Sequence, residues 1–202
     1  MRSLRHLVGA VLLCLGLVSC AVMSSKECQF ADWQQVGLTD GMAGKSLAFF
    51  NERRSDCAEA EVMADTKAYL RGRDQGLKSY CQIQNAAQVG LRGEPYEGVC
   101  PAGIDREFRR RYQIGFDIHR FHDEIAQLEN RFNTLEYRFN HNQRDFERRL
   151  ADPAKNGGHL GLYREFDYEQ RRIREEQGAI QIKLQWTHDQ LRNAEGALTQ
   201  LR

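Results

Sequence analysis

The sequence contains no hydrophobic run long enough to cross a membrane as a helix. Its longest apolar run, residues 7–18, has about a dozen residues, whereas a membrane-spanning helix needs roughly 20. Familiar catalytic and nucleotide-binding signatures are missing too, because the chain has no G-x-S-x-G, H-E-x-x-H, P-loop or dinucleotide fingerprint. We therefore expect neither an enzyme nor a cofactor.

Two further absences narrow the class of function. No two cysteines stand in a C-x-x-C pair, which argues against a redox motif and against a structural zinc site. Neither sign of charge is in excess, since 29 lysines and arginines face 28 aspartates and glutamates. The net charge therefore gives no reason to expect binding to nucleic acid or to an anionic membrane surface.

The N-terminus carries the features of an export signal. Arg2 and Arg5 precede the short apolar run, as in a secretory signal peptide. The run ends in a segment that resembles the bacterial lipobox, in which small and aliphatic residues precede a lipidated cysteine: Leu17, Val18, Ser19 and Cys20. We expect residues 1–19 to be removed and Cys20 to carry the lipid, which leaves four cysteines to pair in an oxidising compartment.

These features predict a lipoprotein of the cell envelope. Ala21 stands where an aspartate, by resemblance to the sorting rule of enteric bacteria, would retain the protein in the inner membrane. We therefore expect an outer-membrane lipoprotein that faces the periplasm. Residues 20–27 are predicted to form a lipidated tether, residues 28–103 a small helical domain rich in cysteine and glycine, and residues 104–202 a helical hairpin.

The hairpin prediction comes from two apolar seams with coiled-coil spacing. The first seam advances by alternating steps of three and four residues, with one polar member: Ile118, Phe121, Ile125, Leu128, Phe132, Leu135, Phe139, Asn142 and Phe146. A second seam with the same spacing runs from Phe166 to Leu201. Residues 152–158 lie between them and contain turn formers that cannot continue a helix. The two seams should therefore fold back as an antiparallel coiled coil.

Folding the seams about the turn at residues 156–158 predicts a register. It places Phe132 opposite Leu184 and the large Phe121 opposite the small Ala194. In this register Asn142 lies next to Ile173, between the layers of two glutamines of the second seam. The buried polar groups of the two seams can then satisfy one another near the loop, which fixes the register at some cost in stability.

The small domain repeats a pattern in which an aromatic residue lies about one helical turn before a glycine. The three copies are Trp33, Gly37, Asp40 and Gly41; Tyr69, Gly72, Asp74 and Gly76; and Tyr112, Gly115 and Asp117. Each glycine leaves room for the ring or for a crossing helix. The intervening segments lack strand alternation, so we predict an all-α fold: a small disulfide-braced helical head followed by a long antiparallel coiled-coil hairpin.

Four cysteines of the small domain allow three disulfide connectivities: Cys28, Cys57, Cys81 and Cys100. Pairing nearest neighbours, as Cys28–Cys57 and Cys81–Cys100, is preferred because local loops close most readily. The sequence leaves the other two connectivities open.

At these residues the sequence resembles an uncharacterised family of bacterial lipoproteins known as domain of unknown function 2799. The resemblance covers roughly residues 27–117 and consists of an ordered series: Glu27, Cys28, Asp32, Trp33, Asp40, Gly41, Cys57, Tyr69, Gly72, Gly76, Leu77, Tyr80, Cys81, Gly90, Gly93, Tyr96, Gly98, Val99, Cys100, Pro101, Tyr112 and Gly115. The activity of the family is unknown, so the resemblance supports the lipoprotein prediction and implies no catalytic residue.

Charged residues of the head are candidates for a small-ligand site, foremost Asp40, Arg71, Asp74 and Arg92, with Asp32, Arg73 and Asp117 as further members. Short aspartates also cap helices and end turns, which is the competing interpretation. His119 and His122 share a helix face, but they flank the seam and no further His or Cys belongs to the same stretch. We therefore expect no metal site.

The function that follows is a non-enzymatic structural or partner-docking lipoprotein. Its hairpin would present a helical surface to another envelope protein. The alternative is a small-ligand or anion-binding periplasmic module that uses the arginines and aspartates of the head. A third class, an envelope hydrolase, would need a buried acid and base in a cleft, and the sequence offers no such pair.

Overall fold

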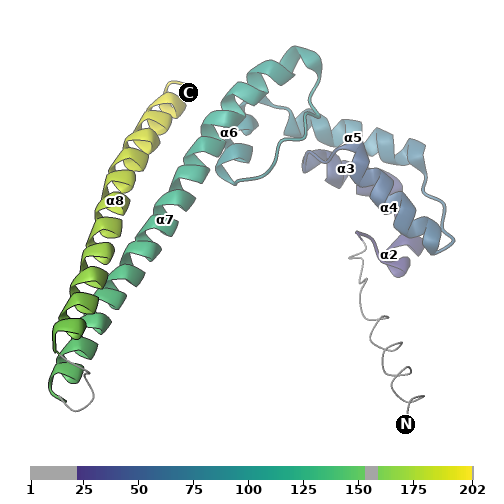
Figure 1. The fold of residues 1–202 in the computed structure, drawn as a ribbon. Coiled ribbons are helices and arrows are strands. Elements are labelled where there is room, and N and C mark those ends of the chain that lie inside the picture. Colours follow the sequence, from purple (N-terminus) through teal and green to yellow (C-terminus); the bar gives the residue numbers. More distant parts are fainter. Residues whose placement is uncertain (1–21, 153–158, 202) are drawn as a thin grey trace, which may run out of the picture. The chain divides into compact units, whose positions relative to one another are not determined.

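A computed structural model describes residues 22–152 and 159–201, and these residues contain helices and no β-strand. The helices are α2 (Ser25–Gln29), α3 (Trp33–Met42), α4 (Leu47–Glu59), α5 (Thr66–Tyr80), α6 (Ile83–Leu91), α7 (Ala102–Leu150) and α8 (His159–Thr199) (Figure 1). The predicted all-α fold is therefore confirmed. No helix in the described ranges is long and apolar enough to span a membrane.

The chain divides into two compact units between Ser79 and Tyr80. This division differs from the sequence-based boundary at residues 103 and 104, which coincides instead with the beginning of α7. Since α6 packs against α7, it belongs with the long helices and not with a head that ends at residue 103.

Unit 1, which contains α2 to α5, has an aromatic core beside a disulfide. Phe50 stacks on Tyr69 with ring centroids 4.0 Å apart, and Trp33 meets Phe50 edge-on. The Cys28–Cys57 disulfide lies in the same core and ties α2 to α4. This is the first of the two bridges that nearest-neighbour pairing predicts.

Glycines let α3 and α5 cross at backbone contact. A Cβ atom added to Gly37 would lie 2.0 Å from the Tyr69 carbonyl oxygen, and one added to Gly72 would lie 1.9 Å from the Gln34 carbonyl oxygen. Gly41 and Gly76, one turn further along each helix, are covered in the same way. The repeated glycines of the sequence thus make room for a crossing helix, as one of the two interpretations anticipated.

The segment predicted to be a tether is largely part of unit 1. The backbone N–H groups of Val22 and Met23 donate to the Asp56 carboxylate at 2.7 and 3.0 Å, and the Met23 side chain is buried. Ser24 and Glu27 then form a reciprocal capping box that begins α2. Composition alone suggested a polar linker because these stabilising contacts come from a residue more than thirty positions away.

Unit 2 begins with a second disulfide and a second glycine crossing. Cys81 is bridged to Cys100, the other predicted pair. Where α6 crosses α7, a Cβ added to Gly90 would lie 2.2 Å from the Tyr112 carbonyl oxygen, and one added to Gly115 would lie 2.1 Å from that of Ala87. The third copy of the aromatic and glycine pattern therefore serves the same purpose as the first two.

The two long helices form the predicted hairpin, in which α7 and α8 run side by side along most of their length (Figure 1). Three ion pairs spaced by heptads join their flanks: Glu124–Lys183, Arg131–Glu176 and Arg138–Glu169. Apolar residues of both seams form the clusters between the helices. The turn at residues 153–158 lies outside the described residues.

The predicted register of the hairpin is wrong by about one helical turn. Phe146 stacks on Phe166 with ring centroids 4.2 Å apart, whereas the prediction would place it opposite Gln170. Counting by heptads from this pair puts Phe132 opposite Ile180, and both belong to the same apolar cluster. The three ion pairs, such as Arg131–Glu176, depart less from this register than from the predicted one. The prediction aligned the two seams about the centre of the turn. The register is instead set by which side chains of one seam interlock with those of the other.

Asn142 and Gln170 occupy the same layer in the observed register. The Gln170 side-chain N–H donates to the Phe139 carbonyl oxygen at 3.3 Å. The Asn142 Nδ2 and Gln170 Oε1 atoms are buried and have no hydrogen-bond partner among residues 22–152 and 159–201. The polar groups of the two seams therefore meet near the loop as predicted, but Asn142 lies opposite Gln170 instead of Ile173. The expected hydrogen bonding between these groups is not observed in the described residues.

Candidate functional site

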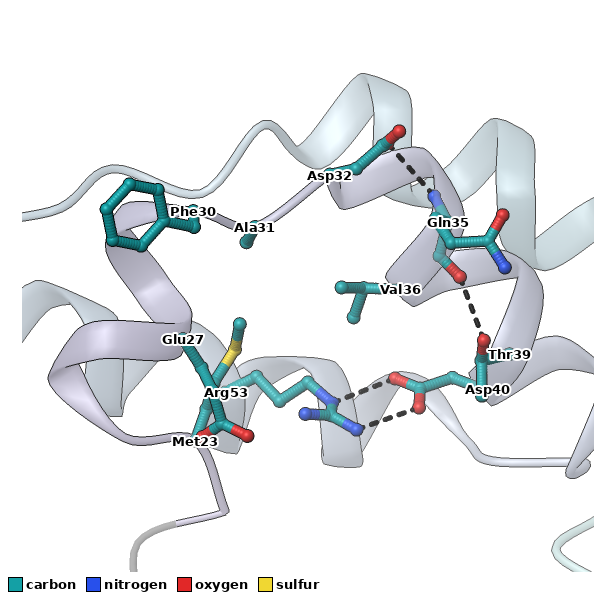
Figure 2. Close-up of a pocket in the computed structure, with 10 residues that line it drawn as sticks. All are labelled: Met23, Glu27, Phe30, Ala31, Asp32, Gln35, Val36, Thr39, Asp40 and Arg53. Carbon is teal, nitrogen blue, oxygen red and sulfur yellow. Dashed lines mark hydrogen bonds and ion pairs between the residues drawn. The ribbon is translucent and has the colours of Figure 1, made fainter.

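The first candidate site is an open pocket of about 440 Å³ in unit 1, between α2, α3 and α4 (Figure 2). Its apolar wall includes Met23, Phe30 and Val36, and its polar wall includes Asp40 and Arg53. Figure 2 shows the Arg53 side chain reaching across the base of the pocket to Asp40. No histidine or cysteine is among the residues that line the pocket, so its only acid–base groups are carboxylates.

The polar wall is organised by the Asp40 carboxylate, which is almost fully buried. It accepts two hydrogen bonds from the Arg53 guanidinium, both at 3.0 Å, and one from the Tyr69 hydroxyl at 3.0 Å. Burial, followed by the charge of Asp40, raises the pKa of Tyr69, so the hydroxyl stays a donor. The charge of Asp40 is thus satisfied within unit 1 and is not held open for a ligand.

The remaining charges give the pocket an acidic surplus. Glu27 and Asp32 also line it, so three carboxylates face one guanidinium. Hydrogen bonds from Ser24 lower the pKa of Glu27, and Asp32 accepts the N–H groups of Gln34 and Gln35 as the N-cap of α3. These carboxylates already serve as helix caps, and their charge repels anions.

The four predicted ligand residues are not brought together. Asp40 is paired with Arg53, whereas Arg71 and Asp74 are exposed on α5. Arg92 lies in unit 2, where it pairs with Glu94 at 2.7 Å. Sequence reasoning missed Arg53, because no local pattern marks an arginine whose partner lies thirteen residues earlier on another helix.

Other residues considered from the sequence have structural roles. Arg73 is buried and donates twice to the Lys45 carbonyl oxygen, which joins α5 to the loop after α3. Asp117 accepts hydrogen bonds from Gln113 and Arg120 on its own helix. His119 pairs with Asp123, and within the described ranges no group of three metal-binding side chains occurs. Cys20, the predicted lipidation site, lies outside the described residues.

The second candidate site is a surface on α8, the outer stripe, made of Gly178, Ile182 and Trp186. These residues repeat every four positions outside the apolar seam of α8. The Lys183 ammonium, which pairs with Glu124 of α7, lies 4.5 Å from the centre of the Trp186 ring. Ile182 is 71% exposed and Trp186 49% exposed, although both are large and apolar. A Cβ added to Gly178 would meet no atom within 4 Å. The four-residue spacing is present in the sequence, but it does not belong to the apolar seam that predicts the hairpin.

The comparisons with known proteins cover the middle of the chain. Residues 32–117 match the model of a family described as protein of unknown function, DUF2799. The resemblance inferred from the cysteine, glycine and aromatic series is therefore confirmed. The DUF2799 match spans both glycine crossings, from the N-cap of α3 to the early part of α7, and ends before most of the hairpin.

One curated relative is similar over a shorter stretch. The uncharacterized protein YfiL of Escherichia coli strain K12 is 30% identical over 69 residues, which is 34% of this chain. The chain spans about half of the length of that relative, 52%. No solved structure matches the chain. Neither the family model nor this relative names an activity.

Proposed function

We propose that this protein is an outer-membrane lipoprotein without enzymatic activity, anchored through Cys20, and that its hairpin docks a helix of another envelope protein. The observation that carries the docking proposal is the outer stripe of α8. An exposed isoleucine and tryptophan stand one turn apart beside a glycine whose open face no part of unit 2 covers.

The chemistry of the stripe supports a helix as its occupant. A glycine inside a helix costs about 1 kcal/mol relative to alanine, and packing usually offsets that cost. In this chain Gly37, Gly72, Gly90 and Gly115 each lie under a crossing helix, whereas a Cβ added to Gly178, as to Gly161 and Gly196 of the same helix, would meet no atom of the described residues within 4 Å. Tryptophan is among the residues that contribute most to protein interfaces. A partner helix that crosses α8 at Gly178 would bury both large side chains.

The anchor proposal is tested by metabolic labelling with palmitate. The protein should incorporate the label, and a Cys20→Ser variant should not. Label retained by the Cys20→Ser variant would contradict the assignment of the lipid to that residue.

The docking proposal is tested with a photo-crosslinking amino acid placed at position 182 in the lipid-anchored protein. The matched control carries it at Asn130, which is exposed on α7 and lies opposite position 182 when the register is counted from Phe132 and Ile180. We expect a discrete heteromeric adduct from position 182 that disappears in a Trp186→Ala background. Equal adducts from both positions, or adducts only between copies of this chain, would contradict the proposal.

Small-ligand binding in the pocket of unit 1 is the second candidate, favoured by its volume of about 440 Å³. Its three carboxylates favour a cationic ligand over an anion. Nuclear magnetic resonance titration with spermidine and with phosphate separates these cases. Saturable shifts at Val36 and Thr39 with spermidine alone would support a cation site, and no shift with either probe would remove this candidate.

A further inference from the structure

The chain is fixed to unit 1 almost immediately after its proposed lipid anchor. Asp56 receives the N–H groups of Val22 and Met23, and the Met23 sulfur lies 3.7 Å from the Cys57 sulfur. Asp56 and Cys57 are close to the C-terminal end of α4, which ends at Glu59. The contacts of Val22 and Met23 therefore define the end of unit 1 at which the chain enters.

Only one residue separates this entry point from Cys20. Two peptide units span at most about 7 Å between the Cα atoms of Cys20 and Val22. This inference rests on the proposed lipidation of Cys20, because the acyl chains then hold this end of unit 1 at the surface of the bilayer. A long flexible tether would have left the orientation of unit 1 open, whereas one intervening residue restricts it.

The same end of unit 1 carries the two most exposed large apolar side chains of the described residues. Met63 is 94% exposed and Phe30 is 79% exposed. Phe30 is the C-cap of α2, two residues after Cys28, and Met63 follows Val62, whose N–H donates to the Cys57 carbonyl oxygen. The Cys28–Cys57 disulfide thus brings both side chains near the entry point.

The turn that presents Met63 is held in place by the end of α4. Glu61 has a φ of 60°, in the left-handed region that non-glycine residues seldom adopt. Its N–H donates to the Ala58 carbonyl oxygen at 3.0 Å. Because Glu59 and Glu61 are exposed next to Met63, the side chain can enter the headgroup layer but not the hydrocarbon core.

We propose that Phe30 and Met63 form a membrane-contact surface that inserts into the headgroup layer of the bilayer holding Cys20. Amphipathic anchoring of this kind adds apolar contact to a covalent lipid and fixes the orientation of the attached domain. A second pair of exposed apolar side chains, Met42 and Leu47, lies toward the opposite end of α4. Leu47 is ten residues before Cys57, about 15 Å along the helix. These residues should stay in water.

Methionine oxidation by chloramine-T, a charged oxidant that stays in water, tests this proposal with an internal control. The lipidated full-length mature protein is placed in vesicles of phosphatidylethanolamine and phosphatidylglycerol at low density, and mass spectrometry follows Met63 and Met42. Relative to the same mature protein made without residues 1–19 and with Cys20→Ser, which carries no lipid, we expect oxidation of Met63 to slow about fivefold or more while Met42 changes less than about twofold. A Phe30→Ser variant should restore much of the Met63 rate, and Leu47→Ser should not.

The outcomes separate this proposal from the one on which it rests. Lipidated protein whose Met63 oxidises at the soluble rate would overturn the membrane-contact surface and leave the anchor intact. Absence of lipid on the N-terminal peptide would overturn both proposals. Protection of Met63 that grows with the density of protein on the vesicle would assign the surface to contact between copies and overturn contact with lipid.

Discussion

The glycine crossings and the hairpin join their helices in opposite ways. At the α3–α5 and α6–α7 crossings, backbones touch because side chains are missing, and an added Cβ would lie about 2 Å from a carbonyl oxygen. Between α7 and α8, the helices are kept apart by interlocking side chains repeated over many layers. The crossings therefore depend on single positions, whereas the hairpin distributes its stability along its length.

The largest expected effect is the loss of unit 1 on Gly37→Leu. Its Cβ would overlap the Tyr69 carbonyl oxygen, and moving α5 away would open the core. We expect a loss of about 4 kcal/mol or more in the free energy of unfolding. Denaturation followed by circular dichroism measures it, with Gly196→Leu, at a position without neighbours, as the control. Similar losses in both variants would refute the distinction between the two kinds of glycine.

The next effect compares a buried ion pair with an exposed one. Asp40→Ala leaves the Arg53 guanidinium and the Tyr69 hydroxyl without their acceptor, and we expect it to destabilise unit 1 by about 3 kcal/mol. Glu176→Ala removes an ion pair of the hairpin whose arginine is mostly exposed, and it should cost less than about 1 kcal/mol. Chemical denaturation distinguishes the two, and equal losses would contradict the role given to Asp40.

A smaller loss of stability is expected in alkali, where the tyrosines of an aromatic cluster in unit 2 ionise. The cluster includes Tyr80 and Tyr96. Burial raises the pKa of Tyr80 to about 12, and burial with the Asp105 hydrogen bond raises that of Tyr96 to about 12. Since unfolded tyrosine ionises near pH 10, the stabilisation is complete below pH 10 and is lost as the pH rises to about 12. Thermal unfolding between these pH values should show the decline, and Tyr80→Phe should reduce it. A decline unchanged by Tyr80→Phe, as in the exposed control Tyr137→Phe, would count against this assignment.

A gain in stability is expected at the polar layer that Asn142 and Gln170 form within the apolar seam of the hairpin. Replacing Asn142 and Gln170 together by leucine removes two buried polar atoms that lack partners, together with the 3.3 Å hydrogen bond from Gln170 to Phe139, and should raise stability by about 1 kcal/mol. The double variant should also weaken the choice of register, because a single polar layer specifies it. Disulfide trapping with cysteines at positions 132 and 180 reports how much of the protein keeps the observed register. Lower stability of the double variant would contradict this account of the layer.

Features set by local sequence could be predicted, and those set by distant contacts could not. The heptads of α7 and α8 predicted a hairpin because helical periodicity is local, and the repeated glycines predicted close packing. The register was missed because it depends on how two seams interlock. The pairing of Arg53 with Asp40, and of Val22 with Asp56, was missed because no spacing rule connects residues on different helices. The outer stripe has a local spacing in the sequence, but only the structure shows that its large side chains are exposed.

Gly178 provides the most direct test of the central claim, that α8 keeps a docking face for a partner helix. Gly178→Ala should stabilise the hairpin by about 1 kcal/mol, because alanine favours the helix and its Cβ meets no atom of the chain. The same variant should strongly reduce the adduct formed from position 182, because a Cβ prevents close approach of the partner. Unfolding and crosslinking are therefore measured on one protein. Greater stability with a lost adduct is the predicted result, and an undiminished adduct would contradict the claim.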